Sequence, residues 1–334
     1  MRKAKAPPRE ETTISDLVEF DDNRLAAALF GEHSRHLALI EERLGVTLHG
    51  RGNRLLIEGT KSGISVAERV LHALYGRLKA GETLNAAEVD GALRVIAADA
   101  ASGETAGEAA VIRTRKRVIT ARSAAQVEYI RKLAANNMVF ALGPAGTGKT
   151  FLAVAMAVAR LAEGSVDRLI LSRPAVEAGE RLGFLPGDLR EKVDPYLRPL
   201  YDALYETMPA EEIAKRFERG EIEVAPLAYM RGRTLSNCFV ILDEAQNTTP
   251  MQMKMFLTRF GENCHMVVAG DPSQTDLPSD RPSGLTHALS VLREVPGIAF
   301  TRFTQRDVVR HALVGAIVEA YEREEAKTGK GDAQ

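Results

Sequence analysis

The chain has 334 residues, of which 45% are hydrophobic and 27% are charged, a composition typical of globular proteins at a length sufficient for two domains. Its formal net charge of −1 excludes a global attraction to nucleic acid, so any such contact must come from a local basic patch. Cys238 and Cys264 lie in or beside apolar runs, which indicates core residues in a reducing cytosol.

Residues 1–14 begin with several basic residues and Pro7-Pro8, and no apolar segment follows them as it would in a signal peptide. We therefore expect a flexible basic tail there. No apolar run approaches the ~18 residues that a membrane span requires, so we expect a cytoplasmic protein that does not associate with membranes.

A small α+β domain is predicted for residues 15–82. Its elements follow one another as helix, helix, strand, strand and helix: Asn23–Phe30, Arg35–Leu44, Val46–His49, Arg54–Glu58 and Ile64–Leu78. This order resembles a KH-type RNA-binding module, in which a G-x-x-G loop between the first two helices clamps the nucleic-acid backbone. Here the loop is Gly31-Glu32-His33-Ser34, so a serine stands at the second glycine position. Two interpretations stay open: a weakened RNA clamp, and a KH-like domain used for packing or assembly.

Residues 83–118 are predicted to contain a helix from Thr83 to Ala97, with Thr83 as its cap, and then a flexible linker from Asp99 to Ala110. Basic residues with no acid among them follow the linker: Arg113, Arg115, Lys116, Arg117 and Arg122. Such a cluster can hold a phosphate backbone, which makes the first four candidates for RNA binding. A solvated basic face has the same pattern, so both interpretations stay open.

An α/β domain is predicted for residues 119–322, and residues 323–334 are charged and polar enough to form a disordered tail. Short apolar runs typical of strands in a buried parallel sheet recur through the domain: Met138–Leu142, Arg168–Ser172, Phe239–Leu242, Met266–Ala269 and Ile298–Thr301. The stretches between these runs predict helices that cover both faces of the sheet.

Residues 143–150 fit the pattern G-x-x-x-x-G-K-[ST] of a phosphate-binding loop. An apolar strand precedes the loop and an Ala-rich helix follows it, which aims the helix N-terminus at the phosphates. We predict that one continuous stretch binds the nucleotide: Gly143, Pro144, Ala145, Gly146, Thr147, Gly148, Lys149 and Thr150. In this site Lys149 reaches the β- and γ-phosphates and the Thr150 hydroxyl ligates Mg²⁺.

Two further predicted strands end in polar side chains. Asp243 and Glu244 follow the strand at 239–242, and we predict that Asp243 holds the Mg²⁺ shell while Glu244 acts as the general base toward water. Gln274 follows the next strand, within Gly270-Asp271-Pro272-Ser273-Gln274, and is predicted to sense the γ-phosphate. Upstream, Gln126 lies where an amide can recognise adenine from the side.

A series of motifs in a fixed order resembles the PhoH-like family of P-loop ATPases, the phosphate-starvation-inducible group: Gln126, Gly143–Thr150, Arg173–Asp188, Asp243–Gln246, Gly270–Gln274 and Asp307–His311. The resemblance implies a RecA-like P-loop NTPase domain that hydrolyses ATP with Mg²⁺ and acts with RNA. Residues 172–188 follow a predicted strand end and are rich in Gly and Pro, which predicts a shaped loop on the active face that can engage a polymer or a neighbouring subunit, so Arg173 is an RNA-binding candidate. For the subtype with a KH-like domain the resemblance also implies a YbeY-type endoribonuclease partner and ribosomal RNA processing. Ser34, Gln305-Arg306 and Ala312 depart from the family pattern.

The family is similar to the first RecA-like core of superfamily 1 helicases, which grip RNA or DNA between two such cores. This chain has one phosphate-binding loop, so unwinding would require a homo-oligomer, most simply a ring. Arg310, the arginine of the C-terminal motif, is then a candidate catalytic residue that reaches a neighbouring subunit's nucleotide.

Two other hypotheses remain. A small-molecule kinase would need an acceptor pocket, and a general base beside the γ-phosphate argues against it because kinases avoid activating water. A non-hydrolysing RNA-binding adaptor, which uses ATP only to stabilise an assembly with a ribonuclease, is compatible with slow turnover.

Overall fold

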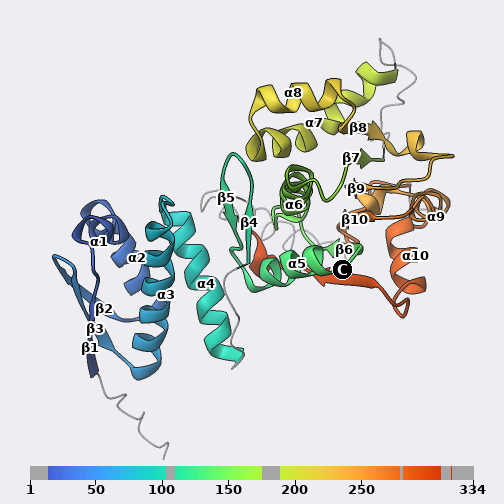
Figure 1. Ribbon diagram of the computed structural model, residues 1–334. Coiled ribbons are helices and arrows are strands. Elements are labelled where there is room, and N and C mark those ends of the chain that lie inside the picture. The colour runs from blue at the N-terminus through green and yellow to red at the C-terminus, as the bar shows by residue number, and fades with distance from the viewer. Residues whose placement is uncertain (1–13, 103–109, 175–188, 279–280, 310–316, 318–334) are drawn as a thin grey trace, which may run out of the picture. The chain divides into compact units, whose positions relative to one another are not determined.

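A computed structural model describes residues 14–102, 110–174, 189–278, 281–309 and 317 (Figure 1). The predictions for the N-terminal tail, the centre of the linker, the loop after Pro174, Arg310 and the C-terminal tail lie outside the described residues. Contacts divide the chain into two compact units. The N-terminal unit contains Met1–Val111 and Thr120–Val127, and the C-terminal unit contains Ile112–Ile119 and Glu128–Gln334. Among the described residues, no helix combines the length and the apolar character that crossing a bilayer needs.

The N-terminal unit is a KH-like α+β domain with an antiparallel sheet in the order β1–β3–β2. Its elements along the chain are β1 (Ile14–Glu19), α1 (Asn23–Phe30), η1 (Glu32–Ser34), α2 (Arg35–Leu44), β2 (Thr47–Arg51), β3 (Arg54–Gly59), α3 (Lys61–Lys79) and α4 (Ala86–Ser102). The ends of α1 and α2 follow from local chemistry. The Asp22 side chain accepts hydrogen bonds from the first turn of α1, and Gly45 ends α2 in the left-handed conformation.

Two features of this unit differ from the predictions. The strand β1 was not predicted, because most of its residues are exposed and Ser15 and Asp16 lie within it. The predicted cap of α4 is wrong. The Asn85 side-chain Oδ1 accepts from Glu88 N at 3.1 Å, and the Glu88 carboxylate accepts from Asn85 N at 2.7 Å. This reciprocal capping box starts the helix after Asn85, so Thr83 lies outside it. Helix α4 packs into the same core as α2 and α3 through Val89 and Leu93.

The loop at the KH-like clamp position has the backbone that a glycine pair favours. Gly31 has φ +76°, and a Cβ there would lie 2.8 Å from the His36 ring. Ser34 has φ +58°, in the left-handed region that costs an L-residue roughly 1–2 kcal/mol. The serine therefore keeps the geometry of the glycine expected at this position instead of changing the path of the loop.

The C-terminal unit is built on a six-stranded parallel sheet in the order β11–β6–β10–β9–β7–β8. The strands are β6 (Met138–Leu142), β7 (Arg168–Arg173), β8 (Ile222–Pro226), β9 (Cys238–Leu242), β10 (Cys264–Gly270) and β11 (Ile298–Arg302). All five predicted strands are present. The edge strand β8 was not predicted, because Glu223 and Pro226 interrupt its apolar pattern.

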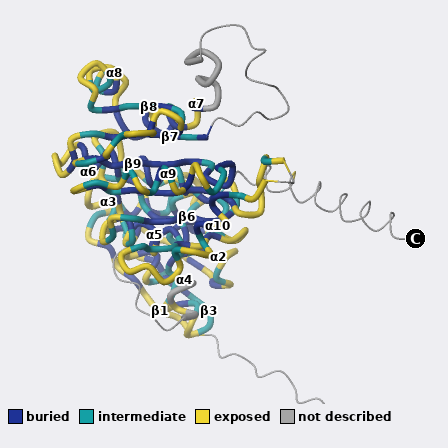
Figure 2. The backbone as a smooth tube through the Cα atoms, turned by 90° about the vertical axis from the view of Figure 1, so that its right-hand side faces the viewer, coloured by how far each residue is buried: buried dark blue, intermediate teal, exposed yellow. Residues whose placement is uncertain are grey.

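Helices cover both faces of this sheet, as Figure 1 shows. One face carries α6 (Lys149–Glu163) and α7 (Leu189–Thr207), and the other carries α9 (Pro250–Leu257) and α10 (Gly284–Val291). The remaining elements are α5 (Ala124–Ala135), α8 (Ala210–Glu218), η3 (Leu227–Met230), η4 (Ala245–Asn247) and η5 (Gln305–Asp307). The strands are mostly buried (Figure 2), and Cys238 and Cys264 are buried free cysteines at paired positions of β9 and β10, as predicted for core residues.

A two-stranded hairpin lies where the sequence predicted only a basic stretch. Strands β4 (Val111–Arg113) and β5 (Val118–Thr120) pair with each other, and the Thr114 hydroxyl and backbone close the turn onto Arg117. The apolar runs in this hairpin are too short to be recognised as strands from periodicity alone.

Candidate nucleotide-binding site

A cavity of about 400 Å³ opens at the carboxyl ends of the parallel strands. This is the edge at which open α/β sheets bind their ligands. The side chains that line it include polar and charged ones from four segments: Lys149, Thr150, Arg173, Asp243, Glu244, Asp271 and Gln274. The sequence predicted all of these at one site except Arg173, which was assigned to RNA, and Asp271, which was given no role.

The phosphate-binding loop has the strand–loop–helix form that was predicted, and it is fixed by a close approach of the chain after β11. Gly143 has φ +137°, and a Cβ there would lie 2.4 Å from the Phe303 carbonyl oxygen. Phe303 N donates to Leu142 O at 2.7 Å, and Val309 N donates to Gly146 O at 3.0 Å. Only glycine allows this contact, so the first glycine of the motif serves packing as well as conformation.

Lys149 lies at the N-terminus of α6 and is mostly buried. Its ammonium group donates to the carbonyl oxygens of Gly143 at 2.6 Å and Pro144 at 2.8 Å. Burial lowers the pKa of Lys149, and the nearby carboxylates of Asp243, Glu244 and Asp271 oppose that shift. The ammonium group is therefore held against the phosphate-binding loop itself, where it can reach a bound phosphate.

Thr150 and Asp243, the residues predicted to ligate Mg²⁺, lie in contact with each other. The Thr150 hydroxyl donates to Asp243 Oδ1 at 2.5 Å, although β10 lies between β6 and β9, the strand that Asp243 follows. Burial, followed by the charge of Glu244, raises the pKa of Asp243, while the Thr150 hydroxyl and Arg173 lower it. Among the described residues no group of three or more His, Cys, Asp or Glu side chains can hold a metal. One hydroxyl and one carboxylate suit Mg²⁺, which takes its other ligands from phosphate and water.

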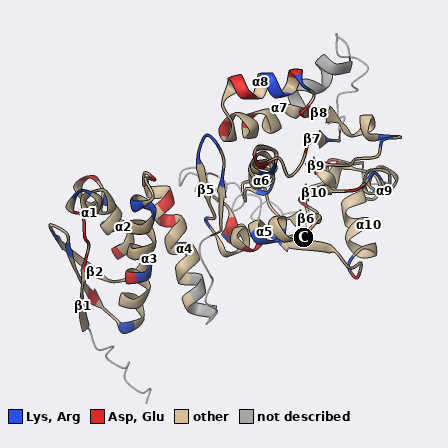
Figure 3. Ribbon diagram, viewed as in Figure 1, with Lys and Arg blue, Asp and Glu red and all other residues tan. Residues whose placement is uncertain are grey.

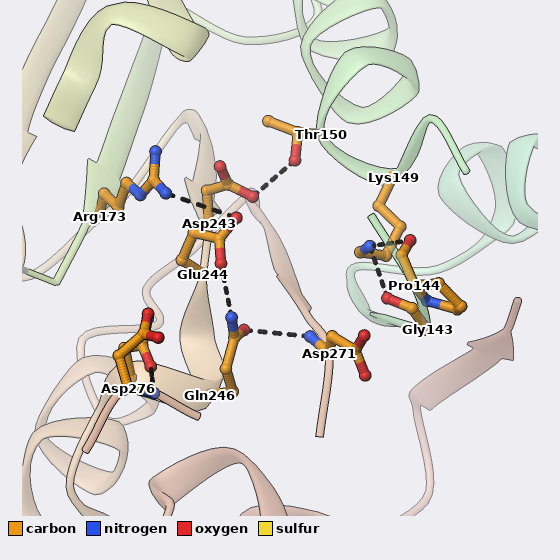
Figure 4. A network of polar contacts seen from close by, with 11 residues as sticks. Gly143, Pro144, Lys149, Thr150, Arg173, Asp243, Glu244, Gln246, Asp271 and Asp276 are labelled. Carbon is orange, nitrogen blue, oxygen red and sulfur yellow. Dashed lines mark hydrogen bonds and ion pairs between the residues drawn. The ribbon is translucent and has the colours of Figure 1, made fainter. Parts of the chain in front are cut away.

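Glu244 is held from two sides, as Figure 4 shows. Its Oε1 lies 3.5 Å from the Arg173 guanidinium, and its Oε2 accepts from Gln246 Nε2 at 2.5 Å. Glu244 also has φ +51°, a left-handed conformation that is rare outside glycine and that often marks functional residues. Backbone and side chain together fix the direction of its carboxylate.

Gln246 joins the ends of two strands. Its Oε1 accepts from Asp271 N at 3.0 Å while its Nε2 binds Glu244. A Cβ at Gly270 would lie 2.6 Å from that same Oε1, so the glycine before Asp271 leaves room for the amide. No role for Gln246 could be predicted from the sequence, because its contacts link two motifs that lie apart in the chain.

Asp271 and Gln274 complete the wall formed after β10. Asp271 Oδ1 accepts from Ser273 N at 3.0 Å and from its hydroxyl at 2.7 Å, while the buried Oδ2 has no hydrogen-bond partner among the described residues. A buried carboxylate oxygen without a donor is costly, so this atom suits a bound water at the site. Gln274 lines the cavity with an exposed side chain, and its role as γ-phosphate sensor stays a prediction.

The basic stretch predicted to contact RNA packs against α7 and α8 of its own unit (Figure 3). Arg115 pairs with Glu212 at 3.3 Å, Lys116 donates to Tyr205 O at 2.5 Å, and Arg117 pairs with Glu206 at 2.8 Å. The Arg117 guanidinium also lies over the Phe151 ring, 4.9 Å from its centroid. Three of the four predicted RNA-binding cations in the hairpin therefore have protein acceptors, and Arg113 is exposed.

The wall that α7 contributes to the cavity could not be predicted from any motif. Residues on one face of that helix line it: Pro199, Asp202, Ala203 and Glu206. Gln126, the predicted adenine contact, belongs to the N-terminal unit, where it is buried and its side-chain Oε1 accepts from Arg122 N at 2.7 Å. Its role stays a prediction, as does that of Arg310.

A phosphate-binding loop between a parallel strand and a helix, facing two carboxylates at the end of a strand two positions away in the sheet, defines a nucleotide-binding P-loop NTPase with a RecA-like fold. Within that class, the chain belongs to the PhoH-like protein family, which matches residues 118–322. The chain is 48% identical to the PhoH-like protein of Synechocystis over 302 aligned residues. The aligned region covers 90% of this chain and 92% of that protein.

Two other relatives show how far the similarity extends. The PhoH-like protein of Bacillus subtilis is 46% identical over 301 residues, covering 90% of this chain and 94% of that protein. Protein PhoH of Escherichia coli is 48% identical over 205 residues, covering 61% of this chain and 58% of that protein. The solved structure of Pif1 helicase from Candida albicans aligns with 55% of this chain and 40% of the Pif1 chain, at 14% sequence identity and a TM-score of 0.30. That TM-score is too low to bear on function.

Proposed function

We propose that this chain hydrolyses ATP in the presence of Mg²⁺. The observation that carries the proposal is the convergence of Lys149, Thr150, Asp243 and Glu244 on one cavity. These side chains supply the parts that phosphoanhydride hydrolysis requires: charge against the phosphates, ligands for a cation, and a carboxylate that accepts a proton.

The reaction then follows from the positions of these groups. Lys149 and the backbone N–H groups of the loop bind the β- and γ-phosphates, while Glu244 orients a water and accepts its proton as the oxygen adds to the γ-phosphorus. The bond from the γ-phosphorus to the β–γ bridging oxygen breaks, which releases ADP and inorganic phosphate. Thr150 and Asp243 would hold Mg²⁺, which supplies neutralising charge to the phosphate oxygens when bound.

Phosphate release from the full chain tests this function, with ATP, GTP, CTP and UTP compared in Mg²⁺ and in excess EDTA. We expect Mg²⁺-dependent release that is fastest with ATP and is lost in the Lys149→Ala variant. Tight binding of ATP without release in any condition would favour the RNA-binding adaptor instead, and transfer of the phosphate to a metabolite would favour the kinase.

We also propose that RNA is the macromolecule on which the ATPase acts. Support comes from the KH-like unit, whose clamp loop keeps left-handed backbone at both Gly31 and Ser34. Adding single-stranded and structured RNA to the ATPase assay tests the proposal, with polyanionic heparin as a control for charge. Stimulation by RNA but not heparin is expected, and identical rates with and without RNA would refute it. The predicted YbeY-type endoribonuclease partner and ribosomal RNA processing are extensions of this proposal.

The assembly that we propose is a homo-oligomeric ring in which Arg310 reaches the neighbouring subunit's nucleotide. Such an arginine is worth roughly 10³–10⁵ in rate. If Arg310 acts across an interface, mixing inactive Arg310→Ala with inactive Lys149→Ala restores turnover at interfaces that combine an intact loop with an intact arginine. Absence of activity at every ratio, in mixtures shown to co-assemble, would refute the trans-acting role.

A further inference from the structure

Arg173 lies in the nucleotide cavity, although its position after a predicted strand made it a candidate for RNA binding. It is the last residue of β7, and its guanidinium lies 3.5 Å from Glu244 Oε1. Its side chain is 21% exposed, against 63% for Arg115 and 45% for Arg117 of the basic hairpin. A guanidinium that is mostly buried in a cavity beside a candidate general base is poorly placed to bind a polymer.

The contact is fixed by the sheet. Strands β7 and β9 pair in parallel with Ser172 opposite Leu242, and Asp243 N donates to Ser172 O at 2.9 Å. The next residues of the two strands, Arg173 and Asp243–Glu244, therefore leave the sheet at the same level. A backbone ladder, and not a mobile loop, sets the distance between the guanidinium and the carboxylates.

Glu244 has a second partner on its other oxygen. Gln246 Nε2 donates to Oε2 and is itself fixed by the Asp271 backbone, while Arg173 contacts Oε1 (Figure 4). With both oxygens engaged, the carboxylate has little freedom to turn toward a water. Of its two partners, Arg173 is the cation, so a competing anion in the cavity attracts Arg173 and leaves the Gln246 contact in place.

We propose that Arg173 is a cis-acting catalytic residue that binds the γ-phosphate and, in doing so, releases one oxygen of Glu244 to accept the proton of the attacking water. The γ-phosphate presents more negative charge and more acceptor oxygens than a single carboxylate, and the planar guanidinium fork matches phosphate geometry. The general base is thereby freed when a triphosphate is present and is held when the terminal phosphate is missing. This role rests on the ATPase function proposed above, and it is separate from any arginine that a neighbouring subunit supplies.

The test measures the preference for ATP over ADP. Affinities for both nucleotides are determined by titration in Mg²⁺ in a Glu244→Gln background, so that ATP survives, and kcat and KM are measured in the otherwise wild-type chain. We compare Arg173→Ala with Arg173→Lys and with a matched control, Arg168→Ala. Arg168 lies at the opposite end of the same strand, away from the cavity.

Arg173→Ala is expected to weaken ATP binding roughly tenfold, to leave ADP binding within about twofold, and to lower kcat about 10²–10³-fold, the size seen when one transition-state donor is lost. Arg173→Lys recovers part of the ATP preference because it keeps the charge but not the fork. Arg168→Ala matches the unmodified chain in both assays.

Equal weakening of ATP and ADP would overturn the proposal, because it would mean a general distortion of the cavity. Unchanged affinities and unchanged basal kcat, with loss only of RNA stimulation, would also overturn it and return Arg173 to RNA binding. If the unmodified chain hydrolyses no nucleotide, the ATPase function fails, and the ATP-to-ADP affinity ratio of the Arg173 variants still decides whether this residue contacts the γ-phosphate.

Discussion

Replacing Glu244 with glutamine is expected to separate nucleotide binding from hydrolysis. The glutamine keeps the shape of the side chain but cannot accept a proton, while Lys149, Thr150 and Asp243 remain in place. A positioned general base contributes ~10²–10⁴-fold, and at about 1.4 kcal/mol for each factor of ten the barrier rises by roughly 3–5.5 kcal/mol.

The same substitution is expected to cost little stability. The ion pair that it removes joins side chains that are 37% and 21% exposed at a distance of 3.5 Å. Pairs of this kind contribute about 0–1 kcal/mol, and the left-handed backbone at Glu244 is unaffected by the change. Loss of turnover in Glu244→Gln therefore cannot be explained by unfolding.

The assay pairs two measurements on the same preparation. Titration with ATP and Mg²⁺ gives the affinity, which we expect within about threefold of the unmodified chain, and a single-turnover experiment gives the rate of the chemical step. Parallel losses in affinity and in single-turnover rate would contradict the reasoning, and would make Glu244 a metal ligand or a structural residue.

Three further predictions follow. Lys149→Ala is expected to lower turnover about 10²–10³-fold with the fold retained, as checked by phosphate release beside circular dichroism, and near-normal turnover would remove its assigned role. The pKa of His265 is lowered by burial and then by Arg160, whose guanidinium lies 2.7 Å from Nε2. The unfolded chain thus binds the proton at higher pH than the folded chain does, so the free energy of unfolding falls as the pH drops below 6.5, the ordinary pKa of histidine. In urea titrations, the free energy of unfolding of His265→Gln should depend less on pH than that of the unmodified chain. Ser34→Gly is expected to stabilise the KH-like unit by up to ~1 kcal/mol, because relief of the left-handed strain exceeds the conformational entropy that glycine adds to the unfolded chain. Unchanged affinity of that variant for single-stranded RNA would favour a packing role for the KH-like unit.

The elements that the sequence predicted best are those whose signals are local. The helices α1 and α2 and the strand β6 were predicted with the bounds that the structure has, because capping residues or flanking glycines mark their ends. Two of the unpredicted strands, β1 and β8, are edge strands in which polar residues or a proline replace the apolar pattern. Backbone pairing to one neighbour holds them, and that pairing leaves no periodic trace in the sequence.

The same distinction between local signals and contacts across strands applies to the candidate site. The phosphate-binding loop and Asp243–Glu244 are contiguous motifs, so their residue types alone located them. The contacts that arrange the site, from Arg173 to Glu244 and from Gln246 to Asp271, join separate strands and depend on the strand order. Residue order alone placed Arg173 after a strand end. Only the pairing of β7 with β9 shows that it lies beside Glu244, the candidate general base.

The contact between the phosphate-binding loop and the chain after β11 determines where the P-loop NTPase domain can be truncated. All six strands are complete by Arg302, so a truncation at that residue would retain the sheet. It would nevertheless remove the Phe303 carbonyl that packs on Gly143 and the Val309 N–H that binds Gly146 O. The minimal functional domain is therefore longer than the minimal foldable one. Fragments that end between Arg302 and Val309 should express as folded proteins with reduced affinity for nucleotide.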